Sequence, residues 1–120
     1  MGFLKNLIKK TAGFKEIEFN VAGVTFKNGR KTRQALIRAI KWKDEPFDKG
    51  VEITFKRYDY EGSLAIGVYA NGEQLGNVPK ELVQEFDQKW TGRYLIEHYE
   101  VLGSGQDQPF GFRVKVLFDK

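Results

Sequence analysis

The side chains that could perform catalysis are few in this chain of 120 residues. It contains no cysteine and a single histidine, His98. Nucleophilic catalysis needs a nucleophile, a base and a group that orients the base. Glu97 directly precedes His98 in an apparent strand, so the two side chains are expected on opposite faces. With one imidazole and no thiolate, the usual zinc ligand sets are also missing. We therefore predict a protein that is not an enzyme and that binds no metal or cofactor.

A second group of chemically active side chains is basic. Residues 27–43 contain no Asp or Glu and seven bases, namely Lys27, Arg30, Lys31, Arg33, Arg38, Lys41 and Lys43. Residues 1–60 carry 14 Lys or Arg against 7 Asp or Glu, whereas residues 61–120 carry 6 against 9, and the net charge of the chain is +4. A block of this kind attracts polyanions electrostatically. The alternative is a solvated helix face in a basic protein.

The first residues have an amphipathic pattern that predicts a short helix. Phe3, Leu4, Leu7 and Ile8 share one side, and Lys5 and Lys9 share the other. This segment could cap the core, dock on a partner or a second copy through residues 3–8, or lie on an anionic membrane. The apolar stripe is short for membrane binding, which makes that alternative the weakest.

No apolar run approaches the roughly 20 residues that cross a bilayer, and the start lacks the apolar centre of a signal peptide. The absence of cysteine suits a reducing compartment. We therefore expect a cytoplasmic protein. Its length and its 41% hydrophobic content fit one domain with a real core.

The elements that must position these side chains follow from the apolar pattern. Alternation predicts short strands at residues 15–26, 51–58, 64–70, 73–75, 93–102 and 110–118. Helices are predicted over residues 30–42 and 79–90; the first would carry an outward basic stripe of Arg30, Lys31, Arg38 and Lys41. Asn71-Gly72 is typical of a two-residue hairpin turn. Because hairpins connect most strands, we predict a mainly β, antiparallel barrel with two helices packed on it.

Three segments of the chain resemble the HIRAN domain family. They are VAGVTF (Val21–Phe26), LAIGVYANGEQLGNVPKEL (Leu64–Leu82) and PFGFRVKVLF (Pro109–Phe118). The resemblance implies an OB-like β-barrel, here residues 15–120 after an N-terminal helix at residues 1–14. It also implies a DNA-binding role, which in helicase-like members of the family captures a single-stranded 3′ end.

The resemblance also implies positions for the DNA-binding residues. They fall on Phe26, Lys27, Arg57, Tyr58, Tyr60, Asn77, Lys80 and Phe110. Aromatic rings offer bases a stacking surface, and Lys, Arg and Asn side chains can hold phosphate or a terminal hydroxyl. Each residue also has a structural alternative: the aromatic rings could pack inward, Asn77 could cap the helix that Pro79 begins, and Lys80 could be an exposed first-turn residue.

These observations predict a non-enzymatic DNA-binding module that binds single-stranded DNA or DNA ends in repair or replication. The family's Asn-Pro run is replaced here by Tyr58-Asp59-Tyr60, which favours general strand or end binding over recognition of a 3′ hydroxyl. The alternative function is a protein-interaction adaptor that docks through the N-terminal amphipathic helix, with the barrel as scaffold.

Overall fold

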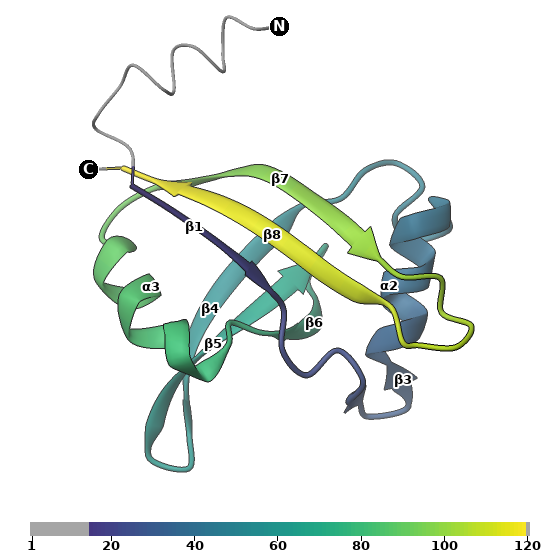
Figure 1. The fold of residues 1–120 in the computed structure, drawn as a ribbon, viewed down its shortest axis with the longest axis horizontal. Helices are drawn as coiled ribbons and strands as arrows, with labels where there is room; N and C mark the ends of the chain where they lie inside the picture. The colour runs from purple at the N-terminus through teal and green to yellow at the C-terminus, as the bar shows by residue number, and fades with distance from the viewer. Residues whose placement is uncertain (1–14, 120) are drawn as a thin grey trace, which may run out of the picture.

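The computed structural model describes residues 15–119 of the chain (Figure 1). The predicted N-terminal helix, and with it the proposed docking segment at residues 3–8, lies outside the described residues. The described elements follow in the order β1 (Lys15–Asn20), β2 (Lys27–Asn28), β3 (Lys31–Thr32), α2 (Arg33–Trp42), β4 (Ile53–Tyr60), β5 (Ser63–Ala70), β6 (Glu73–Asn77), the 3-10 helix η1 (Lys80–Leu82), α3 (Val83–Lys89), β7 (Tyr94–Leu102) and β8 (Gly111–Phe118).

Two antiparallel three-stranded sheets dominate the structure, in the orders β1-β8-β7 and β4-β5-β6. A short antiparallel ribbon of β2 and β3 precedes α2. In Figure 1 the first sheet lies across the second, with α3 at one end and α2 at the other. The prediction of a mainly β, antiparallel fold with two helices is confirmed. Within residues 15–119, no helix is long and apolar enough to span a membrane.

The predicted closed barrel is wrong, because neither sheet closes on itself in the described residues. On one side the two sheets are joined by an isolated bridge between Ala22 and Asn77, with N–H to O distances of 2.8 and 2.9 Å. On the other side β4 and β7 form no ladder and meet through side chains, with the ring centroids of Phe55 and Tyr94 5.1 Å apart. A barrel needs a continuous ladder around its circumference. A β-bulge between Ile96 and His98 also bends β7 at this open side.

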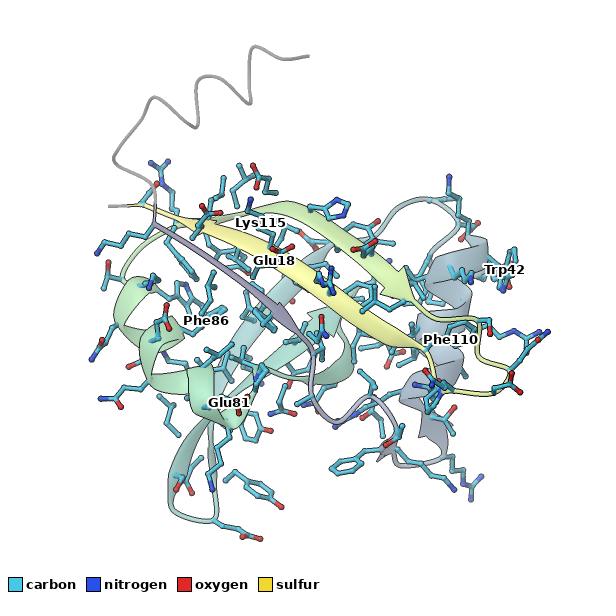
Figure 2. The ribbon with its side chains drawn as sticks, viewed as in Figure 1. Glu18, Trp42, Glu81, Phe86, Phe110 and Lys115 are labelled. Atoms are coloured by element: carbon cyan, nitrogen blue, oxygen red, sulfur yellow. The ribbon has the colours of Figure 1, made fainter. Side chains whose placement is uncertain are left out.

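The core lies between the two sheets and beneath the helices. The ring of Phe86, from α3, contacts Phe19, Phe55 and Phe118 edge to face, with centroid separations of 6.0, 4.9 and 5.0 Å. All four rings are buried, and Figure 2 shows Phe86 beneath α3. Edge-to-face pairs add to the burial of apolar area. Both sheets are therefore tied to α3 through one aromatic cluster.

The first helix begins later than the sequence predicted. α2 starts at Arg33, since the Oγ1 of Thr32 accepts a hydrogen bond from the backbone N–H of Ala35 at 3.1 Å and caps the helix. Arg30 and Lys31 therefore belong to the β2-β3 ribbon and not to the helix. The predicted basic stripe is split, with Arg38 and Lys41 alone on α2.

Local turn chemistry was predicted more accurately than helix ends. Asn71 and Gly72 join β5 to β6 with φ values of 50° and 85°, as the two-residue hairpin turn requires. The strand predicted up to Phe26 ends at Asn20, and Gly23 has a φ of 75°, which a strand cannot accommodate. The second predicted helix, residues 79–90, is divided into η1 and α3.

Candidate nucleic-acid interface

The side chain of Phe26 is 65% exposed on a turn that follows β1. The turn is held on both sides: the N–H of Phe26 donates to the carbonyl of Gly23 at 3.1 Å, and the N–H of Arg33 donates to the carbonyl of Phe26 at 3.2 Å. Gly23 has a positive φ, and a Cβ at this position would lie 3.0 Å from Nη1 of Arg33. The sequence thus places an exposed ring on a backbone with little freedom.

Arg33 lies directly behind this turn and is only 8% exposed. Its Nε donates to Oδ1 of Asn28 at 2.9 Å, and its Nη1 donates to the carbonyl of Gly23 at 2.9 Å. The guanidinium carbon is 5.7 Å from the centroid of the Phe26 ring. Burial lowers the pKa of the guanidinium, and the nearby hydroxyl of Tyr58 acts in the opposite direction.

Arg33 was counted in the basic block but was not recognised as a site residue. The sequence does indicate that Arg33 is buried, because it precedes Leu36, Ile37 and Ile40 at the spacing of a buried helix face. A charged residue at the end of such a face is expected to be buried or paired. That pattern would have separated Arg33 from the exposed bases around it.

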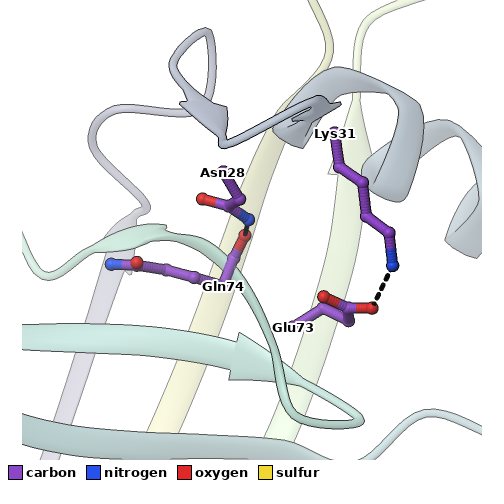
Figure 3. A network of polar contacts seen from close by, with 4 residues as sticks. All are labelled: Asn28, Lys31, Glu73 and Gln74. Carbon is purple, nitrogen blue, oxygen red and sulfur yellow. Dashed lines mark hydrogen bonds and ion pairs between the residues drawn. The ribbon is translucent and has the colours of Figure 1, made fainter.

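A continuous line of hydrogen bonds links the Phe26 turn to the second sheet. Nδ2 of Asn28 donates to the carbonyl of Gln74 at 2.7 Å, as Figure 3 shows. Nε2 of Gln74 donates to Oδ1 of Asn77 at 3.2 Å, and Nδ2 of Asn77 donates to the hydroxyl of Tyr58. Two predicted binding residues, Tyr58 and Asn77, are therefore connected to the turn that carries a third.

Three further predicted DNA-binding residues, which lie close in the chain to Phe26, Tyr58 or Asn77, are exposed. Tyr60 is 60% exposed and shares a face of β4 with Tyr58, since one residue separates them. Lys27 is exposed next to Phe26, and Lys80 is exposed at the start of η1. The hairpin of β4 and β5 that carries Tyr60 extends away from the sheets in Figure 1. We call Phe26, Lys27, Tyr58, Tyr60, Asn77 and Lys80 the Phe26 surface.

Arg57 does not join the Phe26 surface. Its guanidinium carbon is 3.9 Å from the centroid of the Trp90 ring. Its Nε donates to Oδ1 of Asp87 and its Nη2 donates to the carbonyl of Trp90, both at 2.6 Å. Neighbouring residues in a strand face opposite sides, so Arg57 turns to α3 while Tyr58 turns to Asn77. The structure therefore places Arg57 against α3, on the opposite face of β4 from Tyr58.

The ring of Phe110 is buried and is not part of the Phe26 surface. It is 7% exposed, and its backbone N–H donates to Oε1 of Gln34 on α2 at 2.7 Å. Nζ of Lys41 lies 5.4 Å from the ring centroid, and Figure 2 shows Phe110 beside α2. The alternative of inward packing holds for Phe110, and a buried ring presents no face to a base.

The four residues of the predicted basic stripe lie in two separate elements. Arg30 and Lys31 lie in the β2-β3 ribbon that follows Phe26, where Nζ of Lys31 pairs with Oε2 of Glu73 at 2.8 Å (Figure 3). Arg38 and Lys41 lie on α2, which ends at Trp42. Trp42 is 61% exposed, with Nζ of Lys41 5.5 Å from its ring centroid, and sequence reasoning did not select it.

The Phe26 surface combines exposed rings, amides and ammonium groups, which can stack on bases and bind phosphate. Among residues 15–119 no group of three or more His, Asp or Glu side chains could hold a metal ion. Glu97 is the extra residue of the bulge in β7, directly before His98, and its Oε1 pairs with Nζ of Lys115 at 3.0 Å. Comparison of the chain with protein-family models, curated proteins and solved structures found no match.

Proposed function

We propose that this protein is a non-enzymatic DNA-binding module that binds single-stranded DNA or DNA ends in repair or replication. The observation that carries the proposal is the ring of Phe26, which is 65% exposed on a turn fixed by hydrogen bonds to Gly23 and Arg33. Stacking of a base on such a ring contributes about 1–3 kcal/mol. A ring whose backbone is already ordered loses little entropy on binding.

The charge distribution supports the same proposal. Lys27, Arg30 and Lys31 follow Phe26 within five residues, and the first half of the sequence has twice as many bases as acids. Cations beside an aromatic ring are the combination that single-stranded nucleic acids bind. The resemblance to the HIRAN family points to the same class of ligand, with Tyr58, Asn77 and Lys80 beside Phe26.

Fluorescence anisotropy titration of labelled oligonucleotides tests the proposal. The ligands are a thymidine oligomer of about 12 nucleotides, a blunt duplex and a duplex with a single-stranded 3′ overhang. We expect the single strand or the overhang to bind more tightly than the blunt duplex, and the affinity to fall steeply between about 50 and 200 mM salt. Absence of salt-sensitive binding at about 50 mM salt would overturn the proposal.

A further inference from the structure

Arg33 is the one charged side chain that is buried among the described residues. Its contacts are all with neutral groups: the amide of Asn28, the carbonyl of Gly23 and the ring of Phe26. Within residues 15–119 no Asp or Glu forms an ion pair with it, and the first turn of α2 contains no acidic residue. Residues 1–14 contain no Asp or Glu either. The positive charge of Arg33 therefore has no ion-pair partner among residues 15–119.

The guanidinium also retains donors that no described residue uses. Nε and Nη1 are bonded, whereas Nη2 has no protein partner among the described residues. No buried side-chain nitrogen or oxygen in this part of the structure lacks a partner, so Nη2 must reach the surface. Burial lowers the pKa of the group, yet an arginine stays protonated in a protein. A cation held largely out of water binds an anion more strongly than an exposed one does.

We propose that Arg33 is an anion site that takes a phosphate group of the nucleic acid whose base stacks on Phe26. The nucleic-acid part of this inference rests on the proposed function. A guanidinium keeps its positive charge and donates strong hydrogen bonds to phosphate oxygens, and Nη2 is the nitrogen of Arg33 left to bind one. The ring of Phe26 and the guanidinium of Arg33 are 5.7 Å apart, so one nucleotide could engage both through its base and its phosphate.

Thermal unfolding of the full chain tests the anion site without DNA. Inorganic phosphate is compared with chloride at constant pH and ionic strength. When free phosphate is about tenfold above its dissociation constant, we expect the midpoint temperature to rise by about 5 °C, because the ligand binds the folded state. Arg33→Gln should abolish this rise. Arg93→Gln, which removes an equal charge at an exposed position, should retain it.

If Arg33→Gln does not fold, a variant that keeps the positive charge can still test the anion site. Arg33→Lys retains the cation and loses the planar guanidinium with its Nη2, so we expect a smaller but measurable rise with phosphate. Phosphate titration of the wild-type chain by NMR should move the amide signals of Phe26 and Asn28 first. If neither signal moves, or if Arg33→Gln keeps the full rise, the anion site is overturned.

Oligonucleotide titration separates this inference from the proposed function. Arg33→Gln should weaken binding of a thymidine oligomer at least tenfold and reduce the slope of log affinity against log salt by about 1. Unchanged affinity and slope in Arg33→Gln would overturn the phosphate contact and leave the proposed function standing. If the wild type binds no DNA but its phosphate response depends on Arg33, the proposed function fails and the anion site stands.

Discussion

Two arginine–aromatic pairs in this protein have the same residue types and opposite surroundings. At the Phe26 turn, the guanidinium carbon of Arg33 is 5.7 Å from an exposed ring and its described partners are neutral. At α3, the guanidinium carbon of Arg57 is 3.9 Å from the ring of Trp90 and its Nε is bonded to the carboxylate of Asp87. In the first pair the cation is buried and the ring is exposed. In the second the cation is partly exposed and the ring is half-buried.

The difference shows which pair is available to a ligand. Arg57 has its charge balanced by Asp87 and two of its nitrogens bonded to α3 and Trp90, so the pair with Trp90 joins β4 to α3. Arg33 has no ion-pair partner among the described residues, and the Phe26 ring that its guanidinium faces is 65% exposed. A stacked cation near a carboxylate stabilises the fold modestly, whereas an unpaired buried cation is costly unless a ligand completes it.

Trp90→Ala should have the largest effect and separates the two rings by stability. The Trp90 ring packs edge to face against Phe55, Phe86 and Tyr94, so its loss should lower the free energy of unfolding by about 3 kcal/mol. Phe26→Ala should change that free energy by less than about 0.5 kcal/mol, because the ring is exposed. Urea denaturation measures both. Equal losses in the two variants would contradict the comparison.

Phe26→Ala should have the next largest effect, on DNA affinity. Loss of one stacking ring should raise the dissociation constant for a thymidine oligomer about tenfold to a hundredfold. Phe26→Trp keeps an aromatic face and should retain the affinity of the wild type within about threefold. Fluorescence anisotropy at fixed salt gives both values. An alanine variant that binds like the tryptophan variant would show that the ring does not contact the bases.

Arg57→Gln tests whether the second pair is purely structural. It removes the Asp87 ion pair and the contact with Trp90, and the ion pair is about 40% exposed on each side. After allowance for solvent screening, we expect a loss of about 0.5–1 kcal/mol in the free energy of unfolding. DNA affinity and its salt dependence should stay at wild-type values. A fall in affinity with the salt slope reduced by about 1 would place Arg57 at the interface after all.

Lys31→Gln should have the smallest effect. Its ion pair with Glu73 is exposed, so the free energy of unfolding should change by no more than about 0.5 kcal/mol. DNA affinity should fall by less than about threefold, because Glu73 already balances part of the charge. Lys27→Gln is the matched variant, at an exposed base with no ion pair among the described residues, and it should weaken binding more. The reverse order would show that Glu73 does not reduce the contribution of Lys31.

The sequence predicted the parts of the fold that depend on neighbouring residues. The turn at Asn71-Gly72 and the strands on either side of it follow from local conformational preferences and alternation. The start of α2 was misplaced by three residues, because the β2-β3 ribbon that displaces it is too short to leave an alternating pattern. Closure of the barrel was also beyond the sequence, since it depends on how two distant strand edges meet.

The candidate site also has features that the sequence predicts and features that only the tertiary structure shows. Residue types alone could not distinguish Phe26 from Phe110, although one ring is exposed and the other is buried against α2. Alternation along β4 does assign Arg57 and Tyr58 to opposite faces, but only the tertiary structure shows that Arg57 packs against α3 and Tyr58 bonds Asn77.

The sequence by itself determined the class of fold, the hairpins and the excess of basic residues in the first half of the chain. These properties follow from composition, period and local turn chemistry, which need no knowledge of distant contacts. The tertiary structure decided which ring stays exposed and which cation stays unpaired. Both depend on contacts between residues far apart in sequence, as in the bonds that run from Asn28 through Gln74 and Asn77 to Tyr58.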